Sequence, residues 1–498
     1  MTPPWLPSVA DGEALYAAQY RGLQFLASRG FAPKVLPLVY PAPGGRSGDF
    51  RFLDGDGQLW AVRADFTPLA ARALARELAH AQAPLRVCYA GEVARRPQAR
   101  LSGVAAFFQL GFESFAVEGE AVQTVELLLE LVRSLGVAGE QLQLSISHAG
   151  VAEGMLAQLL EDAPDQELLG LMVAKDTATL AERLGLVPEA STMLREALWG
   201  EGERWVRFFG LELAWERFTA IRQRAASLGV AASFEVAPPL PSGYYSGVVF
   251  SLLGQGNQEL AGFRGGVRSG LGAGPHPGGG EHAFPGPAGG GGGMLTLALP
   301  KGRLLAPTLE LLSQAGVGLA AQVEKNPRRL VFQDHELRLV VVKDADVPAY
   351  VEQGVADAGI AGLDQLLEHG GDLLRLVRLP FGHCRLCLLA LQGRPLPDPA
   401  RRWRVASKYP TLARKLFAQR GLWAEVVPLA GSVELAATLG LADYVLDLVE
   451  TGRTVRENGL AILESWLGVA PYLVVGRGVW ETAGEKVKAV ASRLGGVT

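Results

Sequence analysis

The sequence predicts two domains of different class, an α+β domain built on an antiparallel sheet followed by a two-lobed α/β domain. The first observation is the stretch from Leu271 to Gly293, which is rich in Gly, Pro and Ala and ends in five consecutive glycines, as flexible linkers do. The second is that tight turns join the strand-like runs before it. The third is that strand-like and helical runs alternate after it, which is typical of an α/β layer. We therefore expect domains of residues 1–270 and 294–498, joined by a linker of residues 271–293.

The composition of the 498-residue chain is that of a soluble globular protein, with 49% hydrophobic and 20% charged residues. A net charge of −4 gives no electrostatic reason to expect nucleic acid or a membrane surface as a partner. No run of about 18 apolar residues suggests a membrane span. The three cysteines cannot form a disulfide framework, and Met1 does not open a basic region followed by an apolar run, so we expect a cytoplasmic protein.

Cys384 and Cys387 have the CxxC spacing of a redox or zinc motif. The sequence holds no second pair of this kind, and the residues around these two alternate as in a strand. We therefore expect buried strand thiols, with a redox or zinc role as the alternative.

The N-terminal domain is expected to open with a helix at residues 12–28. A hairpin is predicted over residues 50–62, because Asp54-Gly55-Asp56-Gly57 separates two strand-like runs. Asp65, Thr67 and Pro68 are an N-terminal helix signal and predict a helix over residues 67–79. The other expected elements are strands at residues 34–40, 85–90, 107–115, 232–236 and 244–253, and helices at residues 121–135 and through 150–228.

The C-terminal domain is expected to hold a mostly parallel sheet in each of two lobes, with a cleft between them. The first lobe should comprise about residues 294–385 with 471–498, and the second about residues 386–470. The expected strands are residues 295–299, 330–333, 337–343, 358–360, 385–390, 404–407, 424–428, 444–449 and 472–475. The expected helices are residues 304–315, one ending near 354, and 363–369, 411–420, 433–439 and 481–494.

One strand–turn–helix in this second domain has the character of a phosphate site. A β-type run over residues 444–449 leads into the turn Glu450 to Thr454, and helical character resumes at Val455. Gly452 lets the backbone approach a ligand, and the threonine hydroxyls of the turn can donate hydrogen bonds. Asp447 would repel a bare phosphate, so we expect a metal ion or sugar hydroxyls beside it. A ribose 5′-phosphate meets both demands, whereas an ordinary strand–helix joint is the alternative.

Residues 5 to 270 resemble the catalytic core of class II histidyl-tRNA synthetases. The matching pieces are VRADFTPLAAR at Val62 to Arg72, GEVARRPQAR and FFQLGFE between Gly91 and Glu113, and GYYSGVVF at Gly243 to Phe250. Two arginines that the resemblance calls for are replaced by Leu240 and Ala105, which cannot stabilise charge at the ATP α-phosphate. No anticodon-binding domain follows. This combination resembles the synthetase-like regulatory subunit of ATP phosphoribosyltransferase.

That resemblance implies a histidine sensor that does not aminoacylate tRNA. The implied histidine-binding residues are polar or aromatic, and each can bond an ammonium or an imidazole. Completion of an ordinary core is one alternative, and retained activation of histidine is another. The residues are Asp65, Thr67, Gln109, Glu113, Tyr244 and Tyr245.

Residues 294–498 resemble the short form of ATP phosphoribosyltransferase. The motifs are ALPKGRLL from Ala298, KDADVPAYVEQGVADAGIAGLDQL from Lys343, VASKYP from Val405, GSVELA from Gly431, and GLADYVLDLVETGRTVRENGL from Gly440. The implied reaction is attack of adenine N1 of ATP on the anomeric carbon of 5-phosphoribosyl diphosphate, giving phosphoribosyl-ATP and diphosphate. It is the first step of histidine synthesis, and inhibition by histidine through the N-terminal domain is expected.

The same resemblance implies the site residues. The 5-phosphate would lie on Glu450, Thr451, Gly452, Arg453 and Thr454, with Asp443 and Asp447 near ribose hydroxyls. The residues implied in catalysis are Lys301, Arg303, Arg328, Lys343 and Asp447, the cations facing diphosphate or triphosphate.

Lys343 stands where an arginine is expected and lacks its bidentate fork. Mg²⁺ would be held through the substrate diphosphate and possibly Asp447. We also expect a homo-oligomer. The alternative function is a two-lobed module that captures an anion without turnover, as periplasmic binding proteins of similar architecture do.

Overall fold

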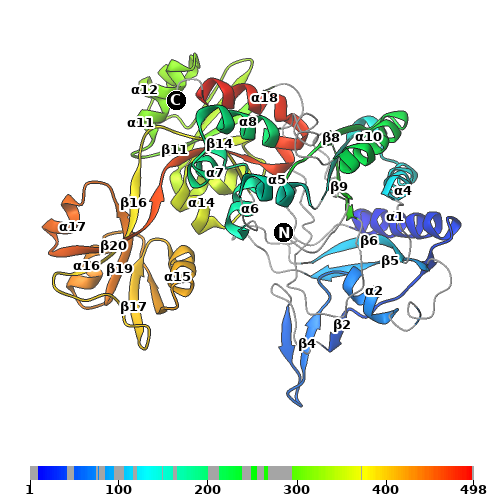
Figure 1. Cartoon of the computed structure of the whole chain (residues 1–498), viewed down its shortest axis with the longest axis horizontal. Coiled ribbons are helices and arrows are strands. Elements are labelled where there is room, and N and C mark those ends of the chain that lie inside the picture. The colour runs from blue at the N-terminus through cyan, green and yellow to red at the C-terminus, as the bar shows by residue number, and fades with distance from the viewer. Residues whose placement is uncertain are drawn as a thin grey trace. The chain divides into compact units, whose positions relative to one another are not determined.

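The structure is a computed structural model of the chain (Figure 1). It describes residues 9–41, 50–74, 77, 85–94, 106–115, 121–148, 150–160, 165–199, 212–237, 248–254, 263–266, 294–371 and 373–495. The chain forms two compact units. The first unit comprises Met1–Val173 and Ala181–Gly286, and the second comprises Ala174–Leu180 and Pro287–Thr498.

The first unit contains two small three-stranded sheets in its N-terminal part. Strands β5 (Leu85–Ala94) and β6 (Ala106–Phe115) pair antiparallel, with β1 (Ala32–Pro33) parallel to β5. Strands β3 (Arg51–Leu53) and β4 (Leu59–Val62) form the predicted hairpin, to which β2 (Val39–Pro41) adds. Asp54 closes its turn by accepting hydrogen bonds from the amides of Asp56 and Gln58. The predicted strand over residues 34–40 is wrong as one piece, because Pro37 lacks the N–H that a continuous ladder needs.

A third sheet of the first unit has the order β10-β9-β7-β8. Its strands are β7 (Leu142–His148), β8 (Ala231–Phe234), β9 (Val248–Gly254) and β10 (Phe263–Gly266). Neither β7 nor β10 was predicted. The helices are α1 (Val9–Ser28), α2 (Thr67–Ala73), α4 (Ala121–Ser134), α5 (Val151–Leu159), α6 (Gln166–Val173), α7 (Thr177–Leu184), α8 (Pro188–Trp199) and α10 (Glu212–Ser227).

The first sheet of the second unit has six strands in the order β12-β13-β11-β14-β21-β15. These are β11 (Leu295–Lys301), β12 (Val331–Gln333), β13 (Leu337–Lys343), β14 (Ala358–Gly362), β15 (Leu373–Arg378) and β21 (Pro471–Gly476). Strand β11 runs parallel to β13 and β14, whereas β21 runs antiparallel to β14 and β15. The helices beside it are α11 (Leu305–Gln314), α12 (Leu319–Lys325), α13 (Val347–Glu352), α14 (Leu363–His369) and α18 (Arg477–Gly495).

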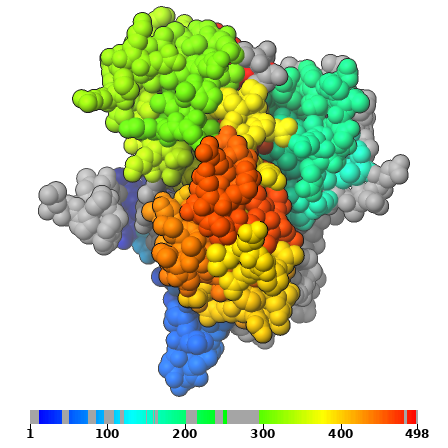
Figure 2. Space-filling model, turned by 90° about the vertical axis from the view of Figure 1, so that its left-hand side faces the viewer, coloured from blue at the N-terminus to red at the C-terminus, as the bar shows by residue number. Residues whose placement is uncertain are grey.

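The second sheet of this unit has the order β18-β17-β19-β16-β20. Its strands are β16 (Cys384–Leu391), β17 (Arg402–Ser407), β18 (Trp423–Pro428), β19 (Tyr444–Val449) and β20 (Leu460–Val469). Its helices are α15 (Pro410–Gln419), α16 (Glu434–Thr438) and α17 (Arg453–Glu457). Figure 2 shows the two parts of the unit's surface, lime green for the start of the first sheet and yellow to orange-red for the second.

The prediction of mostly parallel sheets holds only in part, because both sheets are mixed. Strand β17 is parallel to β18 and β19, but β16 is antiparallel to β19 and β20. The physical reason is the route of the chain, which passes between the sheets through strands rather than through helices (Figure 1). A strand that enters or returns directly, as β16, β20 and β21 do, runs against its neighbours because a parallel neighbour needs a crossover connection.

Strand β16 buries both of its faces. Cys384, Leu386 and Leu388 belong to a core cluster that also includes residues of both sheets, whereas Cys387 and Leu389 belong to a second cluster under α16 and α17. Cys384 and Cys387 are free and buried, so the expectation of strand thiols is confirmed. Residues three apart in a strand lie on opposite faces, which explains why the CxxC spacing makes no pair here. None of the described helices is long and apolar enough to cross a membrane.

Candidate active site

The turn after β19 has the backbone that the sequence indicates. Gly452 is the residue before α17 and has φ of 72°, a left-handed conformation that favours glycine. The carbonyl of Gly452 accepts a hydrogen bond from the amide of Arg456, and the amide of Asn458 donates one to the carbonyl of Thr454. Strand, left-handed glycine and helix thus fix the path of residues 450–454.

All five turn residues line one cavity of about 590 Å³. The cavity lies within the second unit. Its lining residues come from segments that belong to both sheets of that unit. Beside the first sheet, Arg303 follows β11, Asp344 follows β13 and Asp364 lies in the first turn of α14. From the second sheet, Lys408 directly follows β17 and Asp447 lies on β19. Acidic and basic groups therefore face the same space from several segments, as a charged, phosphorylated ligand requires.

Asp447 is one of two buried acids that line this cavity, the other being Asp364. The Oδ2 of Asp447 accepts from Nζ of Lys408 at 3.1 Å, and Lys408 itself is partly exposed. Burial raises the pKa of Asp447, an effect that the charge of Lys408 partly offsets. The pair places one anionic and one cationic group beside the phosphate-type turn.

Lys408 and Tyr409 are held rigidly at the end of β17. The hydroxyl of Ser407 donates to the carbonyl of Leu446 at 2.7 Å and accepts from the amide of Tyr409 at 3.0 Å. The Tyr409 hydroxyl is hydrogen-bonded to the Asp364 carboxyl group, and burial raises the pKa of both groups. Sequence reasoning missed these residues as site residues, although VASKYP places Lys408 directly after a strand end.

Of the four cations implied in catalysis, the structure places Arg303 at the cavity lining but not Lys301, Lys343 or Arg328. Arg303 donates to the carbonyl of Gly382 at 3.3 Å and contacts the sulfur of Cys384 at 3.4 Å. Lys301 and Lys343 are register partners at the carboxyl ends of β11 and β13, exposed and outside the cavity lining. Arg328 lies in the exposed turn after α12, also outside the lining.

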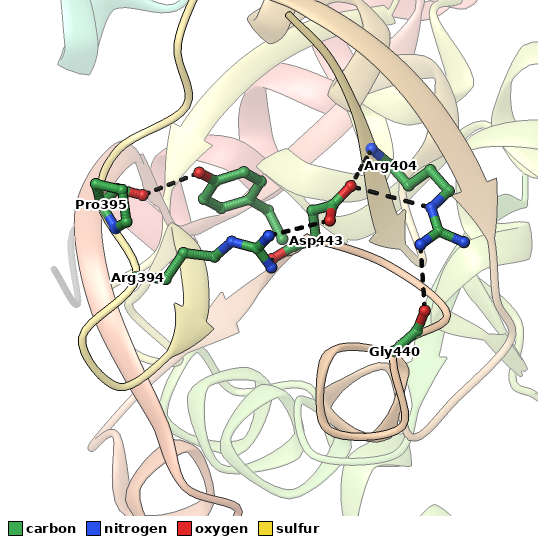
Figure 3. A network of polar contacts seen from close by, with 6 residues as sticks. Arg394, Pro395, Arg404, Gly440 and Asp443 are labelled. Atoms are coloured by element: carbon green, nitrogen blue, oxygen red, sulfur yellow. Dashed lines mark hydrogen bonds and ion pairs between the residues drawn. The ribbon is translucent and has the colours of Figure 1, made fainter.

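Asp443 does not lie at the cavity, and its prediction as a ribose ligand is corrected. It directly precedes β19, whereas Asp447 lies four residues further along the strand. Figure 3 shows the contacts of Asp443. Its carboxylate accepts from Arg394 at 3.1 Å and from the backbone amide of Arg404 at 3.0 Å. The Arg404 side chain also reaches the carbonyl of Gly440. The physical reason is strand length, since four residues of strand separate two groups by roughly 13 Å.

Predicted histidine-binding residues of the first unit form a polar cluster. Glu113 on β6 accepts from the Thr67 hydroxyl at 2.5 Å and from the Tyr89 hydroxyl at 2.9 Å. Asp65 accepts from the Thr67 amide at 3.2 Å. A Cβ at Gly111 would lie 2.6 Å from the Tyr89 ring, so glycine gives this tyrosine the room to reach Glu113.

Gln109 lies on the same strand, and its Oε1 is buried without a hydrogen-bond partner among the described residues. A buried carbonyl oxygen of this kind is expected to have a partner, which a ligand ammonium would provide. Tyr244 and Tyr245 lie outside the described residues. The sequence reading missed Arg63, whose guanidinium lies 3.8 Å from the centre of the Phe66 ring and donates to the carbonyls of Leu36 and Glu92.

The second unit is an α/β unit of two sheets with a cavity lined by charged side chains and by a glycine-containing turn before a helix. Residues 343–496 match the family model described as "ATP phosphoribosyltransferase", and residues 44–274 match the one described as "Histidyl-tRNA synthetase". An "ATP phosphoribosyltransferase" of Halorhodospira halophila is 46% identical over 203 residues, which are 40% of this chain and 94% of that protein. The "ATP phosphoribosyltransferase 2" of Geobacter sulfurreducens is 38% identical over 205 residues, covering 40% and 96%.

A solved structure titled "ATP phosphoribosyl transferase (HisG:HisZ) complex from Thermotoga maritima" has 34% identity, covers 41% of this chain and 98% of its own, and gives a TM-score of 0.37. The family model for residues 343–496 and the two relatives carry the same description, ATP phosphoribosyltransferase. The chain belongs to the ATP phosphoribosyltransferase family, whose members are transferases of histidine biosynthesis, and carries a histidyl-tRNA-synthetase-like region ahead of the transferase region.

Proposed function

We propose that the cavity of the second unit is where this transferase joins ATP to 5-phosphoribosyl diphosphate, with the 5-phosphate on residues 450–454. The observation that carries this proposal is that the whole turn, Asp447 and Arg303 line one cavity. The left-handed Gly452 lets the turn close around a small anion, and the hydroxyls of Thr451 and Thr454 are its side-chain donors.

Asp447 and Lys408 would act on the ribose. The transition state carries positive charge on the ribose and negative charge on the departing diphosphate. An ionised Asp447 stabilises the first of these, and its contact with Lys408 keeps the carboxylate oriented. Arg303 is the cation of the cavity lining that faces the second. Adenine N1 is unprotonated at neutral pH, so no general base is needed and positioning of the two substrates supplies much of the rate.

Lys301 and Lys343 would bind the second polyphosphate. They stand side by side at the carboxyl ends of two parallel strands, a common place for ligand sites in α/β sheets. Arg328 is proposed for the same role from its exposed turn. Their placement outside the cavity lining gives them a weaker expected effect on the transfer step than Arg303 has.

Mg²⁺ would enter with the phosphates of the substrates. No group of three or more His, Cys, Asp or Glu side chains among the described residues could hold a metal ion. Asp447 is engaged by Lys408, so it offers at most one ligand. This agrees with the usual habit of Mg²⁺, which is bound by one or two carboxylates together with substrate phosphates. Shielding of the diphosphate charge is the chemistry that the ion supplies.

The first unit would sense histidine. The ammonium group would donate to the unpartnered Oε1 of Gln109 and to the carboxylate of Glu113, whose position Thr67 and Tyr89 fix. Inhibition of the transferase by histidine follows as part of the proposal. A periplasmic-binding-protein-like arrangement of the two sheets, a homo-oligomeric state and a cytoplasmic location also belong to it.

The experiment that tests the proposed site is an assay of phosphoribosyl-ATP formation with wild-type protein and Arg303→Met. Loss of the Arg303 charge should reduce turnover at least about tenfold, because this cation no longer stabilises charge on the leaving group. Equal turnover in the two proteins would contradict the assignment. Binding of 5-phosphoribosyl diphosphate without any turnover in the wild type would favour the alternative of an anion-binding module.

A further inference from the structure

A short segment of the N-terminal part of the sequence belongs to the second unit. Residues 174–180 are flanked on both sides in sequence by residues of the first unit, yet they are counted with the transferase region by their contacts. The segment comprises the turn after α6 and the start of α7. The transferase reaction described above assigns it no role.

The segment is built into the edge of the six-stranded sheet. Strand β15 is the edge strand, and its register with β21 shifts between Arg375 and Val377. The amide of Arg375 donates to the carbonyl of Ala174 at 2.7 Å. Bulged edges of this kind are normally protected by a covering element, and here residue 174 supplies the missing acceptor.

Three side chains of the segment are anchored within the second unit. Asp176 is fully buried and lies 3.1 Å from the Arg375 guanidinium as an ion pair, and its Oδ1 accepts from the amide of Thr179. Lys175 is buried with φ of 54° and lies 5.2 Å from the centre of the Trp480 ring. A non-glycine residue in this conformation is held by its surroundings, so the turn is fixed rather than loosely packed.

The Thr179 hydroxyl reaches the sheet interior. It lies 2.9 Å from the hydroxyl of Tyr472, a residue of β21 that is 2% exposed. Tyr472 is the register partner of Ala361 on β14, and the preceding residue of β21, Pro471, pairs with Gly362. Gly362 lines the active-site cavity. Tyr472, which contacts Thr179, therefore belongs to the residue pair of β14 and β21 next to the one that contains a cavity residue.

A backbone hydrogen bond links the residue before β21 to the residue before Asp364. The amide of Leu363 donates to the carbonyl of Ala470 at 2.9 Å, which ties the turn after β14 to the turn before β21. Asp364 follows and holds the Tyr409 hydroxyl inside the cavity. A small shift of β21 along β14 would therefore move cavity residues directly, and displacements of about 1 Å in a site can cost roughly a hundredfold in rate.

We propose that Thr179 and Asp176 are positioning residues for phosphoribosyl transfer, because they hold β21 and β15 in the register that shapes the cavity. This inference rests on the location of the reaction in that cavity. It predicts that catalytic turnover depends on the segment even though no residue of the segment touches a substrate.

The test uses the full chain and a cycle of single and double substitutions. Thr179→Val keeps the shape of the side chain and removes the hydroxyl, and Tyr472→Phe removes its partner. Each should lower kcat about fivefold, the value of one hydrogen bond, with KM for both substrates within about twofold. The double variant should lose no more than either single variant, because both remove the same contact.

Two matched controls separate positioning from folding. Thr179→Ser keeps the hydroxyl and should retain the wild-type kcat, and Thr192→Val removes a hydroxyl that is exposed and bonded only locally on α8. Unchanged kcat in Thr179→Val and Tyr472→Phe would overturn the inference, as would a lowered melting temperature with full turnover. A double variant that loses the product of the two single losses would also overturn it.

If Arg303→Met retains full activity while the Thr179 and Tyr472 variants lose it, the assignment of Arg303 fails, and the dependence of turnover on the segment stands without its link to this cavity. If Arg303→Met loses activity and the two variants do not, the site stands and the positioning role fails.

Discussion

The two ends of strand β19 carry the same residue type in opposite roles. Asp447, near the carboxyl end, faces a cavity with one lysine contact and a phosphate-type turn beside it. Asp443, just before the amino end, accepts from a guanidinium and a backbone amide in a closed network with Arg394 and Arg404 (Figure 3). The two carboxylates differ in how many of their hydrogen-bond acceptor positions are already occupied by the protein. An acid that is fully engaged by its own chain stabilises the fold, whereas one that faces a cavity has lone pairs left for a ligand.

The neighbours of each acid reinforce this contrast. Around Asp443 the Tyr444 hydroxyl donates to the carbonyl of Pro395, and Arg394 also donates to the carbonyl of Asp443 itself. Around Asp447 the nearby side chains belong to several loops that meet only at the cavity. The amino end of β19 therefore holds the segment at residues 394–395 in place by hydrogen bonds. The carboxyl end contributes Asp447 to the cavity lining.

The largest expected effect comes from Asp447→Asn. The substitution keeps the shape of the side chain but removes the charge proposed to stabilise the ribose cation. Phosphoribosyl-ATP formation should fall by about a hundredfold, while the melting temperature should not fall. Steady-state kinetics with both substrates saturating, together with thermal unfolding, measure the two effects. A wild-type kcat in this variant would remove Asp447 from the site.

Asp443→Asn should give the reverse pattern. The contact with Arg394 is partly exposed, so we expect a loss of about 1–2 kcal/mol in the free energy of unfolding of this region and activity within about twofold of wild type. Thermal unfolding should show a melting temperature lower by about 2–8 °C. A large loss of activity without loss of stability would restore Asp443 as a site residue and break the comparison.

Tyr444→Phe tests the amino end of β19. It removes the hydroxyl that donates to the carbonyl of Pro395 and leaves the ring packed beside Trp403. The expected cost is about 1 kcal/mol in the free energy of unfolding, with no change in KM for either substrate. Thermal unfolding together with substrate saturation curves measures both quantities. A changed KM would show that the network at this end acts on the cavity.

The pH dependence of stability should also distinguish wild type from Asp447→Asn. Burial raises the folded-state pKa of Asp447 above its unfolded value, so the folded state binds the proton more tightly. The resulting penalty is absent below the unfolded pKa, grows as the pH rises, and is complete above the raised pKa. The Asn variant should therefore gain stability relative to wild type between about pH 4 and neutral pH. A wild type that is the more stable protein at neutral pH would contradict this sign.

Local patterns predicted the elements near the site well. Strands β13 and β19 and helix α14 have the predicted bounds, because each is a short periodic run closed by polar or glycine residues. The turn at residues 450–454 was found from Gly452 and the threonines. The direction of β16 and β21 could not be found in this way, because it depends on how the chain travels between two sheets.

The site residues that the sequence reading missed are those brought together from distant segments. Asp364, Lys408 and Tyr409 join the predicted Asp447 only because segments of both sheets converge at the cavity. The contact of Thr179 with Tyr472 joins residues 293 positions apart, which no local pattern indicates. Asp443 was misplaced because proximity in sequence was treated as proximity to the ligand, although the pair lies along a strand rather than around a turn.

The turn at residues 450–454 is proposed to bind the 5-phosphate of 5-phosphoribosyl diphosphate. Titration calorimetry of that ligand into wild type, Thr451→Ser and Thr451→Val tests this binding. Serine should retain the wild-type Kd within about twofold, and valine should raise it about tenfold, since a hydroxyl bond to a charged phosphate is lost. The same Kd in all three folded proteins would contradict it.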